Sequence, residues 1–116
     1  MTKRRYLLVF IAFPLLFSMM GGCHLKKGYE ALEIYNYFEA KKRFDKSIDR
    51  KTSPSAYGLS AIYFRTDNPF HNLDSAYHYS LLAVETYTQV DSSTHAKWNE
   101  KFNYKLSDAI ELRNKV

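Results

Sequence analysis

Cysteine, glycine and proline are scarce in this chain of 116 residues. It contains one cysteine, Cys23, together with four glycines and three prolines. A single thiol excludes a disulfide within the chain and a metal cluster built on several cysteines. Glycine and proline interrupt helices, so their scarcity favours a helical protein. The fold must therefore be held together by packing alone.

Long hydrophobic runs are also absent. The longest apolar run covers residues 7–17 and includes Pro14, whereas a helix that crosses a bilayer needs about 20 apolar residues. The run follows a basic head made of Lys3, Arg4 and Arg5. A positive head before a short apolar run is typical of a secretory signal peptide.

The segment that ends this leader reads MGGC, with small residues directly before Cys23. It resembles the lipobox of bacterial lipoproteins, although Met20 stands where leucine is commoner. The resemblance implies cleavage before Cys23 and attachment of a diacylglycerol to its sulfur. One acyl chain binds a membrane marginally, whereas two or three hold it durably. An ordinary secreted protein with a chance cysteine is the alternative.

These features divide the chain into a signal peptide with a signal helix at 1–22, a lipidated tether at 23–27 and a helical domain at 28–116. Removing residues 1–22 takes away three basic residues and no acidic ones, which leaves 14 basic and 12 acidic residues and lowers the net charge from +5 to +2. Nucleic-acid binding needs a concentrated positive face. We therefore expect no nucleic-acid partner.

One basic cluster remains in the segment 41–51. Its basic residues outnumber Asp45 and Asp49, and they are Lys41, Lys42, Arg43, Lys46, Arg50 and Lys51. On a helix these residues fall mainly on the side away from Phe44 and Ile48. We interpret the cluster as a solvated face, with affinity for anionic lipid head groups or acidic partners as the alternative.

Apolar and aromatic residues recur at helical spacing along the rest of the chain. One stripe contains Tyr37, Ala40, Phe44 and Ile48, and a second contains Leu73, Ala76, Tyr77, Ser80, Val84 and Tyr87. No comparable alternation predicts a strand. Ser53 before Pro54 and Ser107 before Asp108 are helix-start signals. The sequence predicts an all-α fold of antiparallel helical hairpins, with helices at about 26–35, 37–50, 54–65, 73–89, 94–104 and from 107 onward.

Two segments match each other at an offset of 36 residues, pairing Ala40 with Ala76, Ser47 with Ala83 and Ile48 with Val84. In the first segment Gly28 is followed by Ala40, the aromatic Phe44 and the small Ser47. This spacing resembles a tetratricopeptide repeat over roughly residues 24–90. The resemblance implies an α-solenoid fragment in which a glycine and an alanine let two helices approach closely while the aromatic fills the gap to the next unit. An ordinary helical bundle is the alternative.

Gly58 opens a looser second copy of this pattern, and a third begins near Trp98 and Phe102. The chain then stops at Val116 with an apolar face on its last helix, formed by Ala109, Ile110 and Leu112. Repeat arrays need three or more units and a polar terminal cap. We therefore expect this face to be uncovered and the domain to be incomplete at its C-terminus.

Motifs for catalysis are missing from the sequence. No histidine pair with a glutamate has the spacing of a zinc hydrolase helix, and no serine stands in a nucleophile elbow. Gly28 and Gly58 stand alone, so no phosphate-binding loop is predicted. The remaining alternative is a small ligand-binding or metal-binding lipoprotein, hydrolytic or not, with a site near His71, Asp74 and His78.

The patterns together predict a noncatalytic, membrane-anchored lipoprotein that binds another protein of the bacterial cell envelope. No acidic tract of the kind that sends some lipoproteins to the cell exterior follows Cys23, so we expect it to face the periplasm from the outer membrane. In tetratricopeptide repeats the first helix of each pair lines the concave side, which implies Leu59, Ile62 and Tyr63 as partner contacts, with a core role as the alternative. No cofactor is expected besides the covalent lipid.

Overall fold

The computed structural model describes residues 24–116, and these residues form six α-helices and no strand. The all-α prediction is therefore confirmed for this part of the chain. The predicted signal peptide at 1–22 and the lipid-attachment residue Cys23 lie outside the described residues. The helices are α2 (His24–Glu33), α3 (Tyr37–Ser47), α4 (Thr52–Phe64), α5 (Leu73–Tyr87), α6 (Ser92–Phe102) and α7 (Leu106–Lys115).

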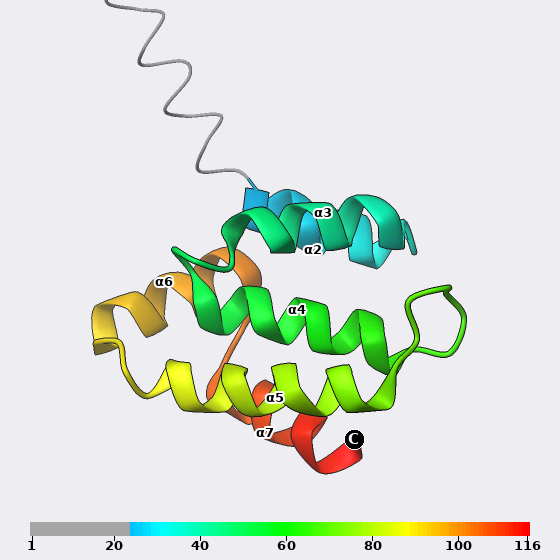
Figure 1. Ribbon diagram of the computed structural model, residues 1–116. Coiled ribbons are helices and arrows are strands. Elements are labelled where there is room, and N and C mark those ends of the chain that lie inside the picture. Colours follow the sequence, from blue (N-terminus) through cyan, green and yellow to red (C-terminus); the bar gives the residue numbers. More distant parts are fainter. Residues whose placement is uncertain (1–23) are drawn as a thin grey trace, which may run out of the picture.

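The helices stack in layers (Figure 1). α2 and α3 form one antiparallel pair, and α4 and α5 form a second pair with a more extensive contact. α3 lies against α4 and joins the two pairs, while α7 packs against α5. α6 leads back toward α2, where the Phe102 ring stacks on Tyr29 at 5.7 Å. The predicted helical pairs are thus present.

Phe44 connects the two pairs. Its side chain is fully buried, with Gly28 of α2 on one side and Gly58 of α4 on the other. A Cβ atom at Gly28 would lie 2.7 Å from the ring, and one at Gly58 would overlap it. The Tyr29 ring packs edge-on against Phe44 at 5.1 Å. Gly28 and Gly58 thus let α2 and α4 approach the Phe44 ring closely, because only a residue without a side chain leaves room for this ring.

α4 is buried on nearly all sides because it lies between α3 and α5. Its serines bond across to the neighbouring helices: the Ser53 hydroxyl donates to the Ala83 carbonyl at 2.7 Å, and the Ser60 hydroxyl donates to the Ala76 carbonyl at 2.6 Å. The predicted start of this helix at Ser53 and Pro54 is displaced, since α4 begins at Thr52 and Ser53 is buried. Pro54 is tolerated because the amide groups of the first turn need no partner within the helix.

A second core cluster forms where α5, α6 and α7 meet. Tyr87 and Tyr104 surround Trp98, with ring centroids 5.6 and 6.1 Å from the indole. The expectation of an uncovered last helix is wrong for its two key residues: Ala109 is fully buried and Leu112 is 9% exposed. The reason is that α7 folds back onto α5, a long-range contact that the apolar pattern alone does not reveal.

Candidate functional site

Exposed apolar side chains gather at the turn between α2 and α3. Ile34, Tyr35 and Phe38 are 73%, 67% and 68% exposed, the highest values among the large hydrophobic residues that the structure describes. Single exposed apolar residues are ordinary, but a group of them marks an interaction site. The turn between α2 and α3 is therefore a candidate interaction site.

Tyr35 adopts a backbone conformation that tyrosine rarely accepts. Its φ angle is 61°, in the left-handed region, and it ends α2 in a Schellman motif. The Asn36 amide donates to the Ala31 carbonyl at 2.9 Å, and the Tyr35 amide donates to the Leu32 carbonyl at 3.2 Å. Glycine is the usual residue here, and a side chain costs about 1–2 kcal/mol. Strained positions of this kind cluster at functional sites.

The loop between α4 and α5 lies beside this turn at the same end of the molecule (Figure 1). Asn68 holds the loop, because its side-chain amide donates to the carbonyls of Ile62 and Arg65 at 2.9 and 3.0 Å, while its oxygen accepts from the Phe70 amide at 2.8 Å. The Asn72 amide donates to the Tyr63 carbonyl at 2.8 Å. These bonds give the loop one conformation and position the side chains that it carries.

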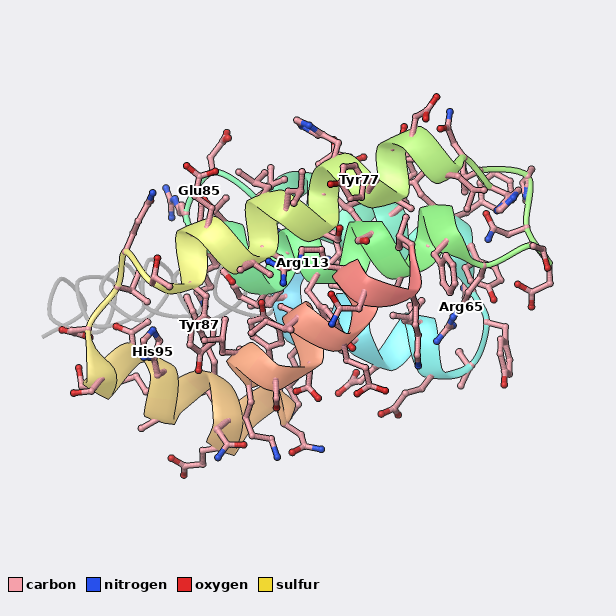
Figure 2. The ribbon with its side chains drawn as sticks, turned by 90° about the horizontal axis from the view of Figure 1, so that it is seen from below. Arg65, Tyr77, Glu85, Tyr87, His95 and Arg113 are labelled. Atoms are coloured by element: carbon pink, nitrogen blue, oxygen red, sulfur yellow. The ribbon has the colours of Figure 1, made fainter. Side chains whose placement is uncertain are left out.

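Arg65 joins the turn to the loop. Its guanidinium lies 5.9 Å from the ring centres of both Tyr35 and Tyr37 and donates to the Leu32 carbonyl at 3.4 Å. The Tyr37 hydroxyl donates to Asp67 at 2.7 Å. Burial and this hydrogen bond raise the pKa of Tyr37 above its ordinary value, so the hydroxyl stays protonated and remains a donor. Figure 2 shows Arg65 at this end of the molecule, away from Tyr87 and His95.

The turn and the loop border a shallow, open groove of about 420 Å³, which we call the aromatic groove. Its lining comes from the two segments and the ends of their helices: Tyr35, Tyr37, Phe64, Arg65, Thr66, Asp67, His71 and Leu73. Beside it, Phe38 packs edge-on against Phe70 at 5.0 Å, and the Lys41 ammonium lies 5.6 Å from the Phe70 ring centre. Tyrosine and arginine are the residue types that dominate binding energy at protein interfaces.

The predicted partner contacts lie elsewhere. Leu59 and Ile62 are fully buried in the core cluster around Phe44, and Tyr63 is partly buried with its ring stacked on Tyr79 at 5.6 Å. Burial gives Leu59 and Ile62 a packing role, so the structure corrects the expectation of partner contact at these two positions. The physical reason is that α3 and α5 cover both sides of α4. One feature of the sequence does point to this end of the molecule: Ile34 and Tyr35 are apolar residues that directly follow the end of a helix, where polar residues are usual.

His71, Asp74 and His78 are not brought together. His71 lines the aromatic groove, whereas His78 lies on α5 with its ring edge-on to Tyr79 at 5.3 Å. No hydrogen bond or ion pair joins these three exposed residues, and residues 24–116 contain no group of three or more His, Cys, Asp or Glu placed to hold a metal ion. The geometry therefore gives the alternative metal-site hypothesis no support.

The groove presents aromatic surface, one guanidinium and one carboxylate, an arrangement suited to holding a peptide segment. Within the part of the chain that the structure covers, no helix is both long enough and apolar enough to cross a bilayer. Comparison of the chain with protein-family models, with curated proteins and with solved structures gave no match.

Proposed function

We propose that this protein is a lipid-anchored scaffold of the bacterial cell envelope that binds another envelope protein through the aromatic groove. The observation that carries this proposal is the group of exposed apolar residues, Ile34, Tyr35 and Phe38, beside a groove that contains Arg65. Such a group is costly to leave in water, and it is retained on a strained turn. The proposal includes Cys23 as the lipidated residue, the outer membrane as the site and the periplasm as the compartment, and it assigns no catalysis.

The position of the groove suits an anchored scaffold. α2 begins at His24, directly after Cys23, and it ends at Glu33, next to the aromatic groove. A helix of 10 residues is about 15 Å long. A lipid on Cys23 would therefore join one end of α2 to the membrane, while the groove lies at the other end. Because the helix starts at His24 and Leu25 is buried, residues 24–27 are part of the folded body rather than a tether.

We also propose that the α2–α3 and α4–α5 pairs are two units of a tetratricopeptide-like solenoid. Phe44 supports this assignment, because it fills the space between the glycine of its own pair and Gly58 of the next. α7 supports it as well, since it packs on α5 much as α4 packs on α3. In this reading α7 occupies the place of the next helix in the array, and α6 crosses back toward α2.

The anchor is tested by metabolic labelling with palmitate in a bacterium that expresses the full chain. We expect the wild-type protein to incorporate label and to sediment with membranes, and the Cys23→Ser variant to lose the label completely. The matched control is Met20→Leu, which carries the commoner lipobox residue and should be labelled like wild type. An intact mass equal to unmodified residues 23–116, or to the uncut chain, contradicts the anchor.

The groove is tested by a photo-crosslinking amino acid placed at single positions of the anchored protein in cells. We expect a discrete crosslinked adduct from position 35 and none from Gln89, which is also exposed, in the turn after α5. Adding Arg65→Ala should remove the adduct, because the guanidinium holds both tyrosine rings in place. Adducts of the same size and yield from both positions would contradict a specific groove.

A further inference from the structure

Positive charge is concentrated in the first helical pair. Residues 24–51 carry eight basic and five acidic residues, whereas residues 52–116 carry six basic and seven acidic residues. The excess of three positive charges in the first segment is thus larger than the net charge of residues 24–116. Residues 52–116 have one more acidic than basic residue, so the positive charge of the described chain is confined to residues 24–51.

The fold brings this charge to the start of α2. Because α3 runs antiparallel to α2, Arg43 and Lys46 in its second half lie near His24, and Arg43 Nη1 lies 2.8 Å from His24 Nδ1. The pKa of His24 is lowered by burial and then by the positive charges of Arg43, Lys46 and Lys27, which places all three near the same end. A neutral histidine at this point accepts a hydrogen bond from Arg43 and fixes α3 against α2.

Some of these basic residues are paired with acids, and others are not. Arg43 binds Glu39 at 2.6 Å and Lys41 binds Asp45 at 2.8 Å. Lys26, Lys27 and Lys46 are exposed and form no ion pair within residues 24–116. We call these three lysines the basic collar.

We propose that the basic collar docks on the anionic phospholipid head groups of the membrane that holds the protein. Positive charge on the collar complements the negative head groups at short range. Lys26 and Lys27 lie in the first turn of α2, two and three residues after His24, which corresponds to about 3–5 Å along the helix, less than the screening length of about 10 Å at 0.1 M salt. The inference rests on the proposed anchor for its biological setting, but the affinity of the collar for anionic lipid is a property of residues 24–116.

Docking of this kind orients the body. A lipid on a single residue leaves rotation about the attachment point free, whereas contact of three lysines with the head groups adds further points of attachment. The aromatic groove lies at the opposite end of α2 from the collar. With the collar on the membrane, the groove faces the periplasm and stays open to a protein partner.

The test uses residues 23–116 with Cys23→Ser, so that no lipid contributes to binding. Both core clusters and all six helices lie within residues 24–116, and circular dichroism checks that each variant is helical. The probe is flotation with vesicles of phosphatidylcholine alone or with added phosphatidylglycerol, at low and high salt. We expect binding only to the vesicles with phosphatidylglycerol, and we expect high salt to remove it.

The decisive comparison is between two triple variants of equal net charge. Lys26→Gln, Lys27→Gln and Lys46→Gln should weaken binding by about a hundredfold, since each lysine near an anionic surface contributes about fivefold. The control replaces Lys97, Lys105 and Lys115, which are also exposed, and should bind like the parent.

Equal losses in the two triple variants, or no binding to anionic vesicles at low salt, would overturn the collar. Palmitate labelling and crosslinking at position 35 are independent of this result. A failed collar with an intact anchor is therefore distinguishable from a failed anchor.

Discussion

Replacing Phe44 with alanine is expected to lower the free energy of unfolding by about 3–5 kcal/mol. The ring is fully buried and lies between Gly28 and Gly58, so its removal leaves a cavity between the two helical pairs. Backbone groups of α2 and α4 face that cavity, and they cannot supply the missing volume. A small domain is stable by about 5–15 kcal/mol, so this loss is a large share of the total.

The measurement is urea unfolding followed by circular dichroism, and the chain supplies a matched control. Phe38 is the same residue type on the same helix, but it is 68% exposed. Phe38→Ala should change the free energy of unfolding by no more than about 0.5 kcal/mol. Similar losses from the two substitutions would contradict the role assigned to Phe44.

Replacing Tyr35 with glycine is expected to weaken the binding of the crosslinked partner by about thirtyfold or more, without loss of stability. Loss of an interface tyrosine at a hot spot costs about 2 kcal/mol or more. Stability should not fall, because glycine accepts the left-handed conformation at φ 61° and relieves strain of about 1–2 kcal/mol. The greater entropy of glycine in the unfolded chain offsets about half of that gain.

Binding and stability therefore move in opposite directions, which a general structural defect cannot produce. Binding is measured by calorimetry with the purified partner, and stability by urea unfolding. The control is Asn103→Gly, because Asn103 also has a left-handed backbone, with φ 52°, at the end of α6. Asparagine tolerates that conformation well, so both properties should stay close to wild type. A large drop in stability on Tyr35→Gly would refute the strain argument.

The interpretation of the helical stripes was largely correct. The predicted helices 37–50, 54–65 and 73–89 correspond to α3, α4 and α5. The starts of α3 and α5 coincide with the prediction, and the other four ends differ by one to three residues. The roles of Gly28 and Phe44 were implied by the resemblance to a tetratricopeptide repeat and not by the stripes, and the structure shows the Phe44 ring packed against Gly28 and Gly58. The stripe on α5 was less exact: Ala76, Ser80, Ala83 and Tyr87 are buried, while Leu73 and Tyr77 are about half exposed.

The aromatic groove could not be predicted in the same way. It depends on contacts such as that between Tyr37 and Asp67, which are 30 residues apart. The resemblance to a tetratricopeptide repeat implied Leu59 and Ile62 as partner contacts, but it did not show that α3 and α5 cover the two sides of α4. The same limit explains the error at Ala109 and Leu112, where the covering helix is α5.

The sequence by itself determined the helices and their apolar faces, because both depend on side chains close together along the chain. Only the tertiary structure decided which faces remain open. The turn between α2 and α3 and the loop between α4 and α5 lie side by side because the four helices pack in layers. This packing leaves Tyr35 exposed next to Arg65. Helix packing depends on the fit of whole surfaces, which no local spacing of residues encodes.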